Sequence, residues 1–287
     1  MSFAVAPQPN LSLSWLRTLE HVQAQPAGRD IHVMSTITNP RAPEDTGVRS
    51  VLDDILDWKK RGEVNIQPVD TVAATIFSPM YNHPGYDWDP AMKGTAREQA
   101  LNNAATTFYD AYASILPRLT DFTANNRGTY FGRMITWPGK EAGGINQVDK
   151  QIRSLRNFNR DVWNAMDITV AGEGEGDEAN ATSGLQTHRA TDTSEYGFPC
   201  LVHVDLTLFQ GRVNMHATYR HQYLITKAYG NAVGLCQLLD FICHQSGRPV
   251  GELVIDATMA DAERNNWGGN SGVERILDRA RAAATTA

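Results

Sequence analysis

Three residues in the second half of the sequence combine a nucleophile, a cation and an amide. Cys200 follows Pro199, Arg220 comes 20 residues after Cys200, and Asn231 comes 11 residues after Arg220. A cysteine thiolate can add to a ring carbon, a guanidinium can hold a phosphate group, and a carboxamide can read the edge of a base. These types at this spacing point to covalent chemistry on a nucleotide.

The residues around Cys200 and Arg220 predict two strands joined by a turn. Residues 201–209 and 212–219 are rich in β-branched and apolar side chains and flank Gly211, so we expect an antiparallel hairpin. A hairpin can bring Arg220 near Cys200, and a nearby cation lowers the pKa of a thiol and makes the thiolate available near neutral pH. The alternative is that Cys200 is a buried structural thiol.

The other two cysteines are predicted to be structural. Cys236 and Cys243 lie on the apolar face of a helix expected over residues 231–245, which Gly247 ends. The three cysteines have no metal-ligand spacing, so no metal site is expected. An odd number of cysteines without a CxxC pair fits a reducing compartment.

Composition limits the possible partners. The 287 residues are 41% hydrophobic and 20% charged, which is typical of globular proteins. The formal net charge of −6 argues against a nucleic-acid polymer or an anionic membrane as the main partner. The N-terminus lacks a basic segment followed by an apolar one, and no apolar run approaches about 18 residues. We therefore expect a cytoplasmic location without membrane insertion.

The remaining segments predict further helices and one more strand. Apolar spacing indicates helices over residues 48–61, 96–120, 145–158 and from about 271, and a strand over 253–256. Residues 71–77 fit either a strand or the start of a buried helix, and loops are expected over 79–95 and 171–196. No internal repeat is present. The pattern predicts an α+β fold in a single domain, with helices flanking a largely antiparallel mixed sheet.

The order of these motifs resembles the thymidylate synthase and pyrimidine nucleotide hydroxymethylase superfamily. Its central motif is a Pro-Cys nucleophile, then an Arg, an Asn, a helix and a strand that begins with Gly and an acidic residue. The residues that match in register are Pro199, Cys200, Arg220, Asn231, Gly251 and Glu252. Residues 128–133 and 144–149 resemble two further family segments, a Tyr-Gly segment and the helix after it. Residues 128–263 match best and residues 1–127 only weakly, so the resemblance implies one thymidylate synthase-like domain over residues 1–287.

The resemblance implies a covalent mechanism. In the family, the cysteine attacks C6 of a pyrimidine nucleoside 5′-monophosphate, and C5 then captures a one-carbon unit from 5,10-methylenetetrahydrofolate. Cys200 would be the nucleophile, Arg220 would contact the phosphate, and Asn231 would hydrogen-bond O4 and N3 of the base. An amide suits uracil, because members that act on cytosine often carry a carboxylate there, but a flipped amide would accept cytosine.

Several positions depart from the family pattern. Asp261 and Glu263 stand where the family has a sugar-binding His and Tyr, and their carboxylates could bind a ribose diol, a different sugar or nothing. His221 stands where the family has a phosphate-binding Ser, and could donate to the phosphate or pack against a neighbour. Trp88 resembles a folate-stacking Trp, although an aromatic residue in a Pro-rich loop more often only covers the surface of the protein.

Other parts of the family site have no clear counterpart. The family forms homodimers in which the partner subunit lends two arginines to the phosphate, and Arg160 and Arg189 are candidates here unless they are solvated surface residues. The catalytic glutamate of the family falls near Asp70 and Thr71, so the general base is unassigned. The family also continues to a C-terminal peptide that closes over folate and excludes water, and no counterpart of this peptide is expected after Glu263.

These observations leave functions from different classes open. The leading hypothesis is a homodimeric methylase or hydroxymethylase that acts on a pyrimidine nucleoside monophosphate with 5,10-methylenetetrahydrofolate. The alternative is a folate-independent nucleotide-binding protein that kept the scaffold but lost one-carbon transfer. A third hypothesis is a folate-independent enzyme that uses Cys200 for exchange or dehalogenation at C5.

Overall fold

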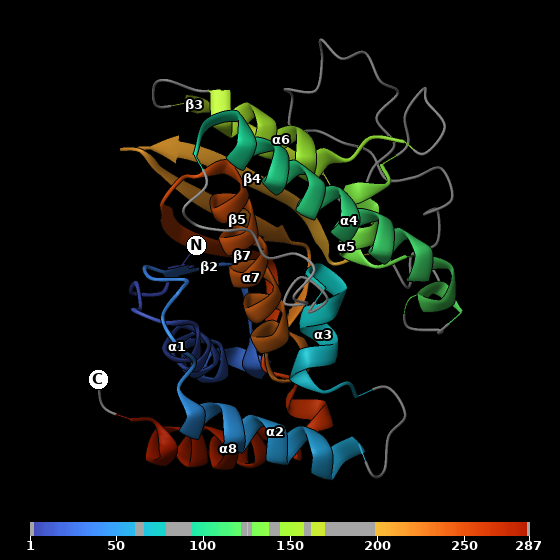
Figure 1. The fold of residues 1–287 in the computed structure, drawn as a ribbon. Helices are drawn as coiled ribbons and strands as arrows, with labels where there is room; N and C mark the ends of the chain where they lie inside the picture. Colours follow the sequence, from blue (N-terminus) through green and yellow to red (C-terminus); the bar gives the residue numbers. More distant parts are fainter. Residues whose placement is uncertain are drawn as a thin grey trace.

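The structure has helices packed on a mixed β-sheet (Figure 1). It is a computed structural model that describes residues 3–60, 66–78, 93–121, 125, 128–137, 144–157, 162–169 and 199–285. Its α-helices are α1 (Leu11–Ala24), α2 (Thr46–Lys60), α3 (Val69–Ile76), α4 (Gly94–Thr120), α5 (Tyr130–Ile135), α6 (Gln147–Asn157), α7 (Tyr229–Ser246) and α8 (Gly269–Ala283). Shorter helical turns are η1 (Pro26–Gly28), η5 (Leu224–Ala228) and η6 (Arg264–Asn266). The strands are β1 (Phe3–Ala4), β2 (Arg29–Ile37), β3 (Val162–Thr169), β4 (Leu201–Phe209), β5 (Arg212–Tyr219), β6 (Gln222–Tyr223) and β7 (Val250–Asp261).

Strand β7 is the centre of the sheet. The strand order is β1-β2-β7-β5-β4-β3, and β6 pairs with β7 outside this path. β7 pairs antiparallel with β2 but parallel with β5 and β6, whereas β4 pairs antiparallel with β3 and β5. The expected α+β class is therefore confirmed, and the sheet is mixed because α7 crosses over between the parallel strands β5 and β7.

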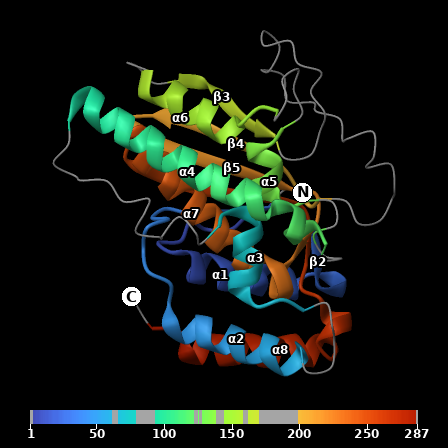
Figure 2. The same cartoon turned by 45° about the vertical axis from the view of Figure 1, so that its right-hand side comes forward.

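One face of the sheet is packed against helices. Along β4 and β5 the buried side chains alternate with partly exposed ones, as expected for strands with one covered face. Helix α7 lies against β5 and β7, and α2 and α8 lie side by side at one end of the molecule in both views (Figures 1 and 2). Within the described residues, no helix is long and apolar enough to cross a membrane.

An aromatic cluster joins the helices that surround the sheet. Phe77 follows α3, and its ring centroid lies 5.5 Å from that of Phe108 in α4, 5.4 Å from Phe131 in α5 and 5.2 Å from Phe241 in α7. Aromatic pairs at such separations add about 0.5–1.5 kcal/mol beyond their area burial. The cluster therefore fixes α5, which leads into the candidate site, relative to α7.

Most of the elements expected from the sequence are present. The helices predicted over 48–61, 96–120, 145–158, 231–245 and from about 271 correspond to α2, α4, α6, α7 and α8. Residues 71–77 are mainly helical, so the strand alternative is wrong, and the strand predicted over 253–256 extends over Val250–Asp261. Helix α1 and strands β2 and β3 were not predicted. Of the loop expected over 79–95, residues 79–92 lie outside the described residues, and its end is wrong because α4 begins at Gly94. The loop expected over 171–196 lies wholly outside the described residues.

Helices α3 and α7 approach closely at two glycines. A Cβ atom added to Gly230 would lie 2.7 Å from the carbonyl oxygen of Val69, and one added to Gly234 would lie 2.7 Å from that of Ala73. Residues four apart share one face of a helix, so the two glycines form one contact surface. A β-branched segment such as α3 is therefore stable as a helix because it packs tightly against this surface.

We expect Gly230→Ala and Gly234→Ala each to destabilise the protein. Overpacking against a backbone carbonyl costs about 1–3 kcal/mol, which exceeds the roughly 1 kcal/mol of helix propensity that alanine adds. Urea unfolding at constant m-value measures the loss. Gln237→Ala, at an exposed position of the same helix, is the control and should change stability by less than about 0.5 kcal/mol. Glycine variants as stable as this control would contradict the close contact.

Candidate active site around Cys200

Cys200 and Arg220 lie side by side at one end of the hairpin formed by β4 and β5. Leu201 pairs with Tyr219, and the backbone N–H of Arg220 donates to the carbonyl oxygen of Cys200 at 2.9 Å. Residues beyond the end of an antiparallel pair remain neighbours across the strands. The hairpin therefore brings the two residues together as the sequence predicts.

A bulge shapes this end of β4. The pairing register shifts between Leu201 and His203, so Val202 has no partner in the ladder. Leu201 and Val204 are both buried although they are three residues apart, which a regular strand would not allow. Such bulges re-aim side chains at the ends of strands. Here the bulge turns the residues before Val202, including Cys200, relative to the rest of the strand.

The guanidinium of Arg220 is held at the start of β4. Its Nε and Nη2 atoms both donate to the carbonyl oxygen of Pro199, each at 3.3 Å. Burial lowers the pKa of Arg220, whereas Cys200 and Tyr130 raise it. Because an arginine remains protonated in any protein environment, a fixed positive charge lies beside Cys200.

Tyr130 holds the backbone of Cys200 from the other side. Its hydroxyl oxygen accepts hydrogen bonds from the backbone N–H groups of Cys200 at 3.2 Å and Leu201 at 3.4 Å. Tyr130 begins α5, and the Thr129 side chain caps this helix by accepting from Gly132 N–H at 3.1 Å. Burial raises the pKa of Tyr130 to about 12, so its hydroxyl keeps its proton.

A second phenol is buried beside the first. Tyr219 is fully buried opposite Leu201, and its hydroxyl has no hydrogen-bond partner within the described part of the chain. Burial, Tyr130 and Cys200 all raise the pKa of Tyr219. An unpaired buried hydroxyl is costly and calls for a functional or structural explanation. Its place beside Cys200 makes it part of the candidate site.

The pKa of Cys200 differs from the expectation. Burial raises it above the ordinary value for a thiol, and the opposing effects of Arg220 and Lys227 do not offset this. The expectation that Arg220 alone makes the thiolate available near neutral pH is therefore wrong for the unliganded chain. Cys236 and Cys243 are buried in α7, and burial raises the pKa of each to about 12, in agreement with a structural role.

Two buried carboxylates lie at the end of β7. Asp261 Oδ2 accepts from Arg29 Nε at 2.7 Å, and its Oδ1 accepts from the Glu263 backbone N–H at 2.7 Å. Glu263 accepts from the backbone N–H groups of Ile225 and Thr226 and from the Thr226 hydroxyl, each at 2.8 Å. Both carboxylates thus accept hydrogen bonds from protein groups, which favours the alternative that they bind no sugar.

His221 begins the segment that leads from β5 to β6. Its ring centroid lies 4.3 Å from that of Tyr223, and its Nε2 atom lies 3.9 Å from Asp261 Oδ2 without a hydrogen bond. Burial lowers the pKa of His221, which Asp261 only partly opposes. The imidazole is therefore neutral near pH 7 and could donate a hydrogen bond to a phosphate without adding charge. The ring contact with Tyr223 fits the packing alternative.

Asn231 is the third residue of α7. It is 6% exposed, and its amide makes no hydrogen bond within the described residues. Asn231 and Cys200 share no hydrogen bond among those residues.

Other residues singled out in the sequence lie away from this group or outside the described part. Trp88, Arg160 and Arg189 lie outside the described residues. The side chain of Asp70 is exposed and its Oδ1 lies 2.8 Å from Arg49 Nη2, so it serves an ion pair on the surface. Within the described residues, no group of three or more potential ligands could hold a metal ion.

Sequence reasoning did not single out two residues whose pKa is affected by the charge of Cys200. Lys227 lies in η5, and its charge and that of Cys200 affect each other's pKa. Tyr223 lies in β6, and Cys200 is among the groups that raise its pKa. One feature of the sequence could have drawn attention to Lys227. It is the single charged residue in the otherwise uncharged run from Gln222 to Leu239.

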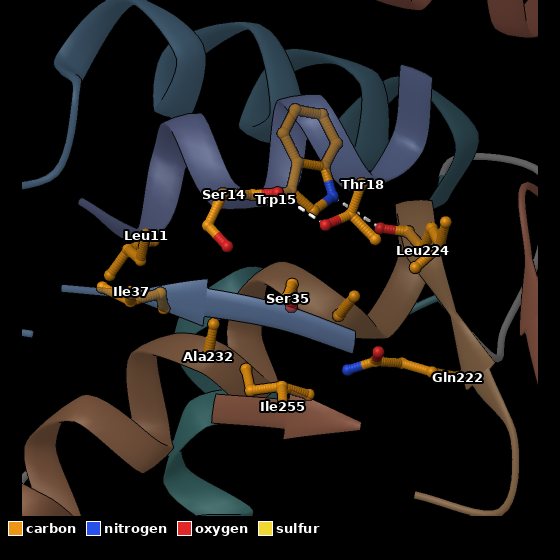
Figure 3. A pocket seen from close by; sticks show the side chains of 11 residues that line it. Leu11, Ser14, Trp15, Thr18, Ser35, Ile37, Gln222, Leu224, Ala232 and Ile255 are labelled. Atoms are coloured by element: carbon orange, nitrogen blue, oxygen red, sulfur yellow. Dashed lines mark hydrogen bonds between the residues drawn. The ribbon is translucent and has the colours of Figure 1, made fainter. Parts of the chain in front are cut away.

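A small cavity lies beside Gln222 of β6. Figure 3 shows that side chains of α1, β2, η5, α7 and β7 line it, with the amide of Gln222 extending toward the space. Trp15 Nε1 donates to the Leu224 carbonyl at 2.6 Å at its edge. The cavity of about 20 Å³ has room for roughly one water molecule and is far smaller than a nucleotide site. It is therefore a packing feature.

Comparisons with known proteins give a partial similarity. No model of a known protein family matches the chain. The chain is 25% identical over 124 residues to two curated proteins named "Putative thymidylate synthase", one from Methanothermobacter thermautotrophicus and one from Methanothermobacter marburgensis. The match covers 43% of this chain and 48% of each relative, so it spans about half the length of the relatives. The similarity to thymidylate synthases is thus weak and partial.

We expect Tyr130→Phe to destabilise the protein by about 1–2 kcal/mol, because it leaves the N–H groups of Cys200 and Leu201 without their acceptor. Tyr219→Phe is a matched control that removes a buried hydroxyl without a partner, and should be neutral or slightly stabilising. Chemical denaturation of both variants measures the difference. Equal losses of stability would show that the Tyr130 hydrogen bonds contribute nothing.

Proposed function

We propose that the chain is a thymidylate synthase-like enzyme that transfers a one-carbon unit to C5 of a pyrimidine nucleoside 5′-monophosphate. The observation that carries the proposal is the contact between Cys200 and Arg220 at the end of the hairpin, with Tyr130 holding the same backbone. A nucleophile beside a fixed cation suits covalent addition to an anionic substrate. The partial similarity to two proteins named as thymidylate synthases supports the same reaction class.

The first chemical step uses Cys200 and two neighbouring residues. The Cys200 thiolate donates an electron pair to C6 of the pyrimidine, and the C5–C6 π pair moves toward O4 to form an enolate. Arg220 binds the phosphate, so the ring is held above the sulfur. The protonated hydroxyl of Tyr130 can donate to an oxygen that gains negative charge. Asn231 provides both a donor and an acceptor for the edge of the base.

The one-carbon donor proposed is 5,10-methylenetetrahydrofolate, which would supply the carbon that C5 captures. The cavity of Figure 3 holds roughly one water molecule, so it is too small for a folate. Trp88, the residue expected to stack on folate, lies outside the described residues. The roles derived above therefore concern the nucleotide alone.

A second function is favoured by one observation. Burial raises the pKa of Cys200, so the unliganded chain holds this residue mainly as a thiol near neutral pH. A nucleotide-binding protein that kept Arg220 but lost one-carbon transfer would have this property. Calorimetry with UMP, dUMP, CMP and dCMP separates the two functions, because such a protein would bind a nucleotide with the same affinity whether or not folate is present.

We expect Cys200→Ala to abolish tritium release from a pyrimidine nucleotide labelled at C5, because release requires the covalent adduct at C6. Cys236→Ala is the control, since Cys236 is buried in α7 and should leave the release rate unchanged if the helix folds. The measurement is tritium in water after incubation with nucleotide and folate. A Cys200→Ala variant that releases tritium at the wild-type rate would remove Cys200 from the mechanism.

We also propose a homodimer formed through the face of the sheet that carries the partly exposed residues. Ile31 is 44% exposed and Met34 is 38% exposed on β2, which is a large apolar exposure for a strand in a monomer. Asp205 and His216 lie opposite each other on β4 and β5, and both are only partly buried. A second copy of the chain would cover both features.

Light scattering after size exclusion should therefore give about twice the chain mass of 31.7 kDa. Met34→Glu should shift the protein toward the monomer, because it introduces a charge into the proposed contact. Lys150→Glu, at an exposed position of α6, is the control and should leave the mass unchanged. A wild-type mass equal to one chain at all concentrations would exclude the dimer.

A further inference from the structure

The cavity of Figure 3 is lined entirely by buried residues. Its eleven lining residues come from α1, β2, β6, η5, α7 and β7, and no side chain among them is charged. Its volume of about 20 Å³ exceeds the roughly 10–15 Å³ that one water molecule needs. A charged occupant would be buried without an opposite charge, which is costly. An occupant of this cavity is therefore neutral and about the size of a water molecule.

Three polar side chains of the lining have no hydrogen-bond partner within the part of the chain that the structure describes. Ser14 of α1 is 3% exposed, Ser35 of β2 is 8% exposed and Gln222 of β6 is 5% exposed, so bulk water does not reach them freely. In Figure 3 the Ser14 hydroxyl points from α1 toward the strands, and the Gln222 amide points toward the same space. Buried polar groups are nearly always bonded to protein or to ordered water.

The other two polar side chains of the lining already have partners. Trp15 Nε1 donates to the carbonyl oxygen of Leu224 at 2.6 Å, and the Thr18 hydroxyl donates to the carbonyl oxygen of Ser14 at 2.7 Å. The hydrogen-bonding capacity that the protein leaves unused at this cavity thus belongs to two hydroxyls and one amide.

A water molecule matches these three groups in number and in kind. Each serine hydroxyl can donate or accept, and the glutamine amide offers both donors and an acceptor. A buried water typically makes about three hydrogen bonds to groups that would otherwise be unsatisfied. An apolar occupant of the same size would leave all three groups unpaired, at a cost in free energy for each.

We propose that one ordered water molecule occupies this cavity and is bound by Ser14, Ser35 and Gln222. The water then bridges α1, β2 and β6. Strand β6 is two residues long and pairs with β7 at Gln222 and Tyr223, so a water bound to Gln222 adds a link to a short ladder. The segment that follows Arg220 is thereby held against α1 and β2. This inference does not depend on the proposed function.

A crystal structure of the full chain, at a resolution that shows ordered water, tests the site directly. We expect one water at about 2.7–3.2 Å from the Ser14 hydroxyl, the Ser35 hydroxyl and the Gln222 amide. A direct hydrogen bond from Gln222 to either serine, or a cavity without water, would overturn the proposal.

A double-mutant cycle tests the same site in solution, without nucleotide or folate. Ser35→Ala and Gln222→Leu should each lower the midpoint of urea unfolding, by about 0.5 M for the loss of one buried hydrogen bond. Because both residues bind the same water, the double variant should lose less than the sum of the two single losses.

A matched control and a second pair complete the cycle. Ser50→Ala removes an exposed hydroxyl from α2, and its effect should simply add to that of Gln222→Leu. If Gln222→Leu does not fold, as judged by circular dichroism, Ser14→Ala combined with Ser35→Ala gives an equivalent cycle. Strictly additive losses in the cavity pair would show that the two side chains share no water.

Discussion

The carboxylate of Glu263 connects the end of the central strand to the start of the helix that carries Asn231. It accepts hydrogen bonds from two backbone N–H groups of η5, and these bonds fix the segment that connects β6 to α7. Its own backbone adopts a φ of 58°, a left-handed conformation that costs a non-glycine residue roughly 1–2 kcal/mol. Hydrogen bonds to a charged group contribute about 1.5–3 kcal/mol each, so two of them outweigh this strain. The placement of Lys227 and Asn231 follows from this one interaction.

Burial and charge oppose each other throughout the site. Desolvation raises the pKa of Cys200, Tyr130 and Tyr219, and lowers the pKa of Arg220 and Lys227. Every one of these shifts favours the neutral form of the group. The unliganded site is thus biased against the charges that the proposed chemistry needs, and a dianionic substrate would change this balance by bringing negative charge to the cations.

The sequence predicted the parts of the fold that depend on local pattern. The hairpin of β4 and β5, helix α7 and its end at Gly247 follow from alternation, helical spacing and a glycine with a left-handed φ of 72°. Strand β2 was missed because a residue with positive φ, His32, interrupts its alternation. The hydrogen bond from the Cys200 N–H to the Tyr130 hydroxyl joins residues 70 positions apart, which no short pattern reveals.

The glycine surface of α7 has a consequence for motion at the site. Asn231 directly follows Gly230, whose Cα lies against the backbone of α3, so the helix that presents this amide cannot slide or rotate without separating two backbones already at their closest distance. Any adjustment of the protein to different ligands must then come from the segments before η5. The side-chain amide of Asn231 therefore has a fixed position, so a bound base would have to fit this position in size and hydrogen-bonding pattern.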